Sequence, residues 1–169
     1  MRFTLSLWTA VLVLALLGCG QVTAPLVPTP SSLPSSADAC HVKDMTYCAL
    51  NPAVTQATIK VTICVVGWTA TIRPPASYTS ALKVQQIAAE HLSDTNPADY
   101  EEDHRMPLEL GGAPKDVWNL SPEAHTSSSA KDADENAAKA SVCSGAKTLL
   151  QAQTALVAKW LAVYPAYKQ

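Results

Sequence analysis

One run of residues, from Tyr100 to Leu120, constrains the fold of this chain more than any other stretch. It reads Tyr-Glu-Glu-Asp-His-Arg-Met-Pro-Leu-Glu-Leu-Gly-Gly-Ala-Pro-Lys-Asp-Val-Trp-Asn-Leu. Residues 100–110 are expected to form the first strand, and the Gly-Gly-Ala-Pro sequence that follows predicts a turn. Residues 117–120 are expected to form a short return strand, which ends at Ser121-Pro122. The run therefore predicts a hairpin with several polar side chains.

Helical patterns lie on both sides of this hairpin. Helices are expected from Thr79 or Ser80 to about Leu92, over 130–142 with Ser127, Ser128 and Ser129 as candidate caps, and over 148–164. The last of these carries a mostly apolar stripe at helical spacing, formed by Leu149, Gln153, Leu156, Trp160 and Tyr164. Upstream, 54–61 reads as a short helix and the β-branched stretch 62–66 as a strand. Strands and helices in this order predict one compact α+β domain over 40–169.

Residues 1–18 are predicted to be an export signal. A positive start at Arg2 precedes an apolar run from Leu5 to Leu17, which is shorter than the roughly 20 residues of a permanent membrane span. The ending Leu-Leu-Gly-Cys resembles a bacterial lipobox, which implies cleavage before Cys19 and attachment of lipid to it. An ordinary signal peptide that happens to contain a Cys is the alternative.

Residues 19–39 read as the lipidated Cys and a Pro/Ser-rich tether. Prolines recur among serines at 25, 28, 30 and 34, and such a stretch buries too little apolar surface to fold. Extended, it would reach roughly 60 Å. The expected location is outside the cytoplasm at the cell envelope, with the membrane as a partner and no protein partner implied. Gly20 after the lipidated Cys favours the outer membrane in a host that has two.

Four cysteines remain for the domain, an even number in an exported protein. Three pairings are open to them, and the sequence does not decide among them. The preferred pairing joins Cys40 to Cys48 in a small loop and Cys64 to Cys143, which would staple the start of the domain to a later helix. The alternative is a zinc site from Cys40, His41 and Cys48, although their spacing lacks a Cys-x₂₋₄-Cys knuckle.

The string Asp-His-x₂-Pro-Leu-x-Leu-Gly-Gly-x₆-Asn-Leu, which begins at Asp103, resembles the active-site hairpin of HNH nucleases, the ββα-metal group. The resemblance implies an α+β fold with a small ββα-metal hairpin–helix motif flanked by helices and stapled by disulfides. It also implies a metal-dependent endonuclease in which Asp103 binds the metal, His104 activates water, and Asn119 ties the hairpin together and orients the base.

These residue types suit hydrolysis of a phosphodiester. A carboxylate is a hard ligand for Mg²⁺ or Mn²⁺, the expected cofactors, with Zn²⁺ as an alternative. An imidazole titrates near neutrality and can act as a general base. Neighbours on a regular strand point to opposite faces, so Asp103 and His104 are expected to flank one phosphate only if the strand twists or bulges. For the ligand on the following helix, Asn136 and Asp132, four residues apart on one face, are favoured over His125.

Three further stretches, 55–64, 73–79 and 131–145, resemble a family of small exported bacterial proteins that are HNH-endonuclease-like, and the likeness covers roughly residues 51–167. The segment before Lys131, which often carries a His in that family, is Ser-rich here. Arg73, within the second stretch, is expected to pair with an acidic residue between Asp94 and Asp103, with a phosphate contact as the alternative.

Charge bears on the partner. Loss of the signal removes Arg2, one of 12 Lys and Arg residues, so the remaining chain has 11 basic and 14 acidic side chains. It has no Lys/Arg stripe of the kind that is typical of nucleic-acid-binding surfaces. The expected function is still cleavage of nucleic acid, DNA rather than RNA, at the cell envelope. The rival is a non-catalytic envelope lipoprotein that keeps an HNH-like scaffold. A zinc phosphatase or peptidase lacks a supporting His-Glu-x-x-His motif.

Overall fold

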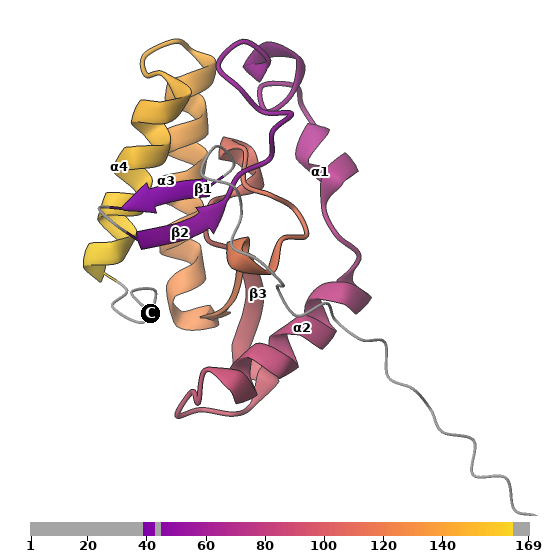
Figure 1. Cartoon of the computed structure of the whole chain (residues 1–169). Helices are drawn as coiled ribbons and strands as arrows, with labels where there is room; N and C mark the ends of the chain where they lie inside the picture. The colour runs from indigo at the N-terminus through magenta and orange to yellow at the C-terminus, as the bar shows by residue number, and fades with distance from the viewer. Residues whose placement is uncertain (1–38, 43–44, 164–169) are drawn as a thin grey trace, which may run out of the picture.

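The computed structural model describes the backbone of residues 39–42 and 45–163 and the side chains of residues 48–160. The predicted export signal, the predicted lipidation at Cys19 and nearly all of the predicted tether lie outside the described residues. The described part is an α+β structure of helices and small two-stranded antiparallel sheets, as expected (Figure 1). None of its helices has the length and apolar character that crossing a bilayer requires.

The helices and strands follow one another along the chain in the order β1 (Ala39–Val42), β2 (Met45–Ala49), α1 (Trp68–Ile72), α2 (Ala76–Ala89), β3 (Tyr100–His104), β4 (Leu120–Ala124), α3 (His125–Cys143) and α4 (Leu149–Val163). Strands β1 and β2 pair with each other, as do β3 and β4. The β1–β2 hairpin was not expected from the sequence. Its end is tied to the β3–β4 connection, because the Asn51 N–H donates to the Gly111 carbonyl at 2.8 Å.

The predicted hairpin forms, but β3 ends at His104, well before the predicted limit at Leu110, and the return strand starts later than expected. Residues 117–119 form a 3-10 turn in which the Trp118 N–H donates to the Asp116 carboxylate at 2.9 Å, and β4 begins only at Leu120. Pro122 lies inside β4 and does not end it. A proline is tolerated there because a strand of a two-stranded sheet has one edge without a partner, where no N–H is needed.

Helix α3 begins at His125, five residues before the predicted start. The serines do not cap it. The Ser127 and Ser128 hydroxyls donate to the carbonyls of Ala124 and His125, which are the competing bonds that such side chains make inside a first helical turn. Gly145, in the left-handed region at φ +83°, follows the end of the helix.

The region 54–66 was predicted wrongly. It contains no strand and only a single 3-10 turn, Ile59–Val61. The β-branched side chains there serve a packed loop, in which Ile63 is fully buried and the Thr62 hydroxyl donates to the Thr58 carbonyl at 2.8 Å. Helix α2 also differs from expectation, because it starts directly after Pro75, which is compatible with a helix start, and ends at Ala89.

The hydrophobic core gathers around Trp160 and joins the 54–64 loop, the β3–β4 connection and both C-terminal helices. The predicted stripe of α4 is buried at Leu149, Gln153, Leu156 and Trp160, while Tyr164 lies outside the described residues. The predicted disulfide between Cys64 and Cys143 is confirmed and closes a separation of 79 residues. Burial and this staple together fix the loop against the end of α3.

The remaining cysteines lie on the first hairpin. Cys48 is disulfide-bonded, and its backbone pairs with that of Cys40 across β1 and β2. The Cys40 side chain lies outside the described residues. A disulfide-bonded Cys48 offers no thiolate to a metal, so the alternative of a zinc site from Cys40, His41 and Cys48 does not hold.

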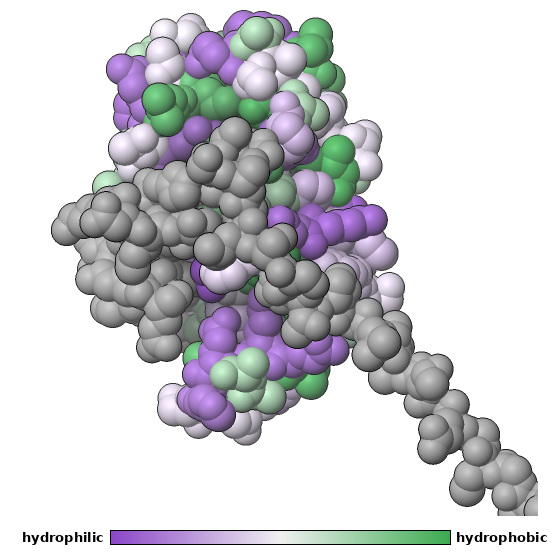
Figure 2. All heavy atoms as spheres, viewed as in Figure 1, coloured by the Kyte–Doolittle hydropathy of each residue, from purple (hydrophilic) through white to green (hydrophobic). Residues whose placement is uncertain are grey.

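Helices cover the β3–β4 hairpin from two sides (Figure 1). From α2, the Lys83 ammonium donates to the Tyr100 carbonyl at 2.6 Å and the Gln86 amide donates to the Leu120 carbonyl at 2.9 Å. Helix α3 lies on the other side, with α4 packed beside it. Figure 2 shows hydrophobic side chains near the end of the molecule formed by the 55–66 loop and the α3–α4 turn, where Val66 is fully exposed.

Candidate functional site

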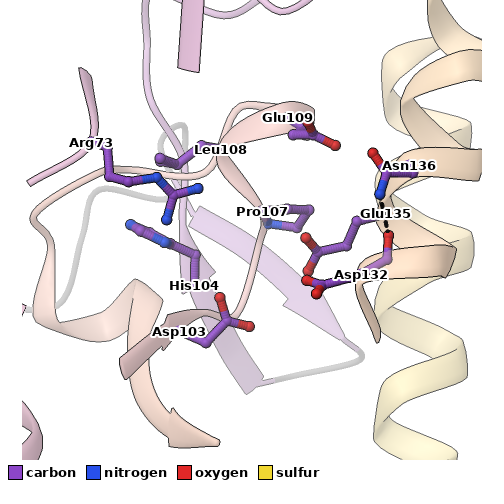
Figure 3. Close-up of a pocket in the computed structure, with 9 residues that line it drawn as sticks. All are labelled: Arg73, Asp103, His104, Pro107, Leu108, Glu109, Asp132, Glu135 and Asn136. Atoms are coloured by element: carbon purple, nitrogen blue, oxygen red, sulfur yellow. Dashed lines mark hydrogen bonds between the residues drawn. The ribbon is translucent and has the colours of Figure 1, made fainter. Parts of the chain in front are cut away.

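A pocket lies where the end of β3 meets α3 (Figure 3). Three segments far apart in the sequence line it, which is a common property of functional sites because the tertiary fold brings their side chains together. The lining residues are Arg73, Asp103, His104, Pro107, Leu108, Glu109, Asp132, Glu135 and Asn136.

Asn119 holds the loop that shapes this pocket. Its side chain is fully buried, its Oδ1 accepts from the Met106 N–H at 2.8 Å, and its Nδ2 donates to the carbonyls of Met106 and Ala113 at 2.9 and 3.0 Å. The Arg105 N–H donates to the Asn119 carbonyl at 2.7 Å. These four bonds tie the residues after β3 to those before β4, and thereby fix the backbone next to His104.

His104 is the last residue of β3 and is 3% exposed. Its Nε2 lies 3.1 Å from the Pro114 carbonyl, which can only accept, so Nε2 carries the proton and Nδ1 is left as an acceptor. Among the described residues Nδ1 has no hydrogen-bond partner. Burial lowers the pKa of His104 to about 4, and the nearby Arg73 charge acts in the same direction. The ring is therefore neutral at pH 7.

Arg73 lies beside the His104 ring (Figure 3). It is exposed and, within the described part of the chain, forms no ion pair. The expected pair with an acidic residue between Asp94 and Asp103 is therefore not formed. An exposed guanidinium at the rim of a pocket, with its donors uncommitted, is suited to bind a phosphate group.

Asp103 and His104 point to opposite sides of β3, the carboxylate toward α3 and the ring toward Arg73 (Figure 3). Their stretch of β3 pairs in regular register, Asp103 with Ser121 and His104 with Leu120, so no bulge turns one toward the other. Both line the same pocket because it lies at the end of the strand, where the chain turns away. A molecule in the pocket would lie between the two groups.

Lys131, which the sequence did not single out for a role, is the centre of the charge cluster beneath the pocket. Its side chain is 2% exposed, and its ammonium makes a short ion pair with the Asp103 carboxylate. Further ion pairs join it to Glu135 at 3.0 Å and to Glu123 at 3.3 Å. The only sequence signal for this cluster was the i,i+4 spacing of Lys131 and Glu135.

Two further contacts fix the position of the Lys131 side chain. The ammonium donates to the His104 carbonyl at 3.1 Å and lies 4.6 Å from the centre of the Trp160 ring. Both oxygens of Glu123, whose side chain is 1% exposed, lack a hydrogen bond in spite of the nearby ammonium. Burial accordingly raises the pKa of Glu123 to about 7.

The residues predicted as helix-borne metal ligands differ in position. Asp132 and Asn136 are exposed on α3 and line the pocket, but the Asn136 amide donates to the Asp132 carbonyl at 2.9 Å, within its own helix. His125 is exposed at the start of α3 and does not line the pocket. In the described part of the chain, no three His, Cys, Asp or Glu side chains are grouped closely enough to hold a metal ion.

Glu102, on the α2 side of β3, gives the fold a pH dependence. Both its oxygens are buried without a hydrogen-bond partner, and burial, reinforced by the Glu90 charge, raises its pKa from an ordinary 4.5 to about 8. Between these values the folded state holds a proton that the unfolded state releases, so the stability contributed by the neutral form is lost as pH rises toward 8.

We expect Glu102→Gln to remove this dependence. Relative to the variant, the wild type should lose roughly 2–4 kcal/mol in the free energy of unfolding between pH 5 and pH 8.5. Urea denaturation at both pH values measures it. Glu101→Gln removes a neighbouring carboxylate of the same strand and should change the pH slope much less. Equal slopes in the wild type and Glu102→Gln would show that Glu102 is ionised throughout.

No protein-family model, no curated protein and no solved structure matches this chain.

Proposed function

We propose that this protein is a metal-dependent endonuclease that hydrolyses phosphodiester bonds of nucleic acids, with β3, β4 and α3 forming a ββα-metal, HNH-like motif. One observation carries the proposal. A neutral histidine, with Nδ1 free, faces a pocket that also holds an uncommitted arginine and a carboxylate. A base, a phosphate-binding cation and a hard oxygen ligand are the groups that this reaction requires.

The donor set fits a hard divalent cation such as Mg²⁺ or Mn²⁺. All candidate ligands at the pocket are oxygens, from Asp103, Asp132, Glu135 and the Asn136 side chain. The Lys131 ammonium on Asp103 stands in for such a cation, since it shows that this carboxylate attracts positive charge. Mg²⁺ commonly needs only one or two protein carboxylates and keeps several waters, so a preformed group of three is not required. When bound, the cation would neutralise charge on the phosphate.

The chain's own residues supply the rest of the reaction. His104 Nδ1 accepts a proton from a water molecule, the water oxygen attacks phosphorus, and one P–O ester bond breaks as the departing oxygen takes a proton from solvent. The Arg73 guanidinium binds a non-bridging phosphate oxygen and orients the phosphorus toward that water. The Pro114 carbonyl keeps the proton on Nε2, so Nδ1 is the basic nitrogen of this pocket-lining ring. Asn119 holds the loop that sets this geometry.

The proposed substrate is DNA that reaches the cell envelope. Arg73 gives the His104 side of the pocket a local positive charge in a chain that is acidic as a whole. Phosphate contacts of this kind fix the position of a backbone without reading its bases, so the proposed cleavage is independent of sequence.

Plasmid nicking tests the proposal. Full-length protein purified in detergent should convert supercoiled plasmid to the nicked form with Mg²⁺ or Mn²⁺, and excess EDTA should stop the conversion. Intact plasmid with both ions, and with Zn²⁺, from pH 6 to pH 9 would contradict it. That outcome would favour a non-catalytic envelope protein with an HNH-like scaffold, a rival supported by the ion pair in which Lys131 already occupies Asp103.

A further inference from the structure

The site contains a buried cation of its own, the Lys131 ammonium. The Lys131 ammonium is held by Asp103, Glu135 and Glu123, by the His104 carbonyl and by the face of Trp160. The Lys131 side chain is 2% exposed, and its contacts come from β3, β4, α3 and α4, so it is fixed within the fold. A surface lysine, by contrast, forms only a weak ion pair with a carboxylate.

The charges around Lys131 do not balance. Three carboxylates surround one ammonium, and all three side chains are at least three-quarters buried. Above pH 7, where Glu123 is ionised as well, the surplus is negative and the cluster attracts further positive charge. Of the three carboxylates, Asp103 and Glu135 line the pocket and Glu123 is not among the lining residues. A further cation would have to approach Asp103, because its side chain is the most exposed of the three at 25%.

We propose that Lys131 is a positioning residue that competes with the divalent cation for Asp103 and so weakens metal binding at this site. This inference rests on the proposed function for the location of the metal. An incoming metal ion would share the Asp103 carboxylate with the Lys131 ammonium, which already contacts it. Two positive charges bound to the same carboxylate in a partly buried site repel each other strongly. In exchange, Asp103 and the His104 backbone stay in position without metal, because the ammonium binds both.

The test is the affinity for Mn²⁺, measured by titration calorimetry on the full-length protein in detergent. Lys131→Met keeps most of the length of the side chain and removes its charge, and should bind Mn²⁺ at least tenfold more tightly than the wild type. The double variant Lys131→Met/Glu123→Gln also removes the deeply buried Glu123 carboxylate, so the net charge of the cluster does not become more negative, and it serves if the single variant is unstable. It should show the same gain. Near-UV circular dichroism checks that each variant is folded.

Lys159→Met is the matched control. Lys159 lies on α4 and pairs with Asp134, which does not line the pocket, so its loss removes one positive charge without freeing Asp103. Its Mn²⁺ affinity should stay within about twofold of the wild type, since exposed charges at a distance are screened. Unchanged or weaker Mn²⁺ binding in a folded Lys131→Met or double variant would overturn the proposal. Failure of both variants to fold would also overturn it, because Lys131 would then be a structural counter-ion.

Plasmid nicking by the same preparations separates this inference from the proposed function. Tighter Mn²⁺ binding by the Lys131 variants, with no nicking by any form of the protein, would support the competition and reject the nuclease. Metal-dependent nicking by the wild type, with equal Mn²⁺ affinities in all variants, would support the nuclease and reject the competition.

Discussion

Replacement of His104 by Ala should reduce metal-dependent plasmid nicking by at least 100-fold, because the one imidazole among the described residues that line the pocket is lost and a positioned general base contributes roughly 10²–10⁴ to the rate. His104→Gln should be equally inactive. Its amide can still donate toward the Pro114 carbonyl but has no basic nitrogen, so it separates proton transfer from packing. Initial rates of nicking, with the fold checked by circular dichroism, measure both effects.

His125→Ala is the matched control, since that histidine is exposed at the start of α3 and does not line the pocket. It should nick at the wild-type rate. Because the pKa of His104 is about 4, protonation of this base should not slow the wild type between pH 9 and pH 5, and the rate should fall as pH drops toward 4. Nicking by His104→Ala within tenfold of the wild type would remove His104 from the mechanism.

Gly112→Ala should destabilise the domain by about 3 kcal/mol or more. A Cβ at this position would overlap the Met106 carbonyl oxygen and lie 2.6 Å from Asn119 Nδ2. Neither atom can yield cheaply, because the two are hydrogen-bonded to each other at 2.9 Å and that bond closes the loop. The free energy of unfolding from urea titration measures the loss.

Gly145→Ala provides the comparison. A Cβ there meets no atom within 4 Å, but the residue lies at φ +83°, so only the backbone strain of the left-handed region is introduced. That strain costs about 1–2 kcal/mol. If Gly112→Ala costs no more than Gly145→Ala, the close approach at Gly112 is relieved by movement of the loop, and the tie through Asn119 is weaker than its geometry indicates.

The features that were predictable from the sequence depend on neighbours along the chain. The Gly-Gly pair marked a turn between two strands, helical spacing marked the buried side of α4, and the even number of cysteines supported the Cys64–Cys143 disulfide. The same reasoning failed for 62–66, where β-branched residues indicated a strand. A β-strand requires a neighbouring strand to pair with. The packing of Ile63 into the core and the disulfide at Cys64 hold residues 62–66 where no strand lies alongside them in the described part of the chain.

The sequence by itself therefore determined the hairpin, the helix that follows it and the presence of Asp103 and His104 on one strand. Only the tertiary structure decided what surrounds them. Lys131 lies 27 residues from His104 along the chain and reaches it from another element, and the partners of its ammonium come from β3, β4, α3 and α4. Side-chain periodicity describes one element at a time, whereas the burial of a charge depends on every element that packs around it.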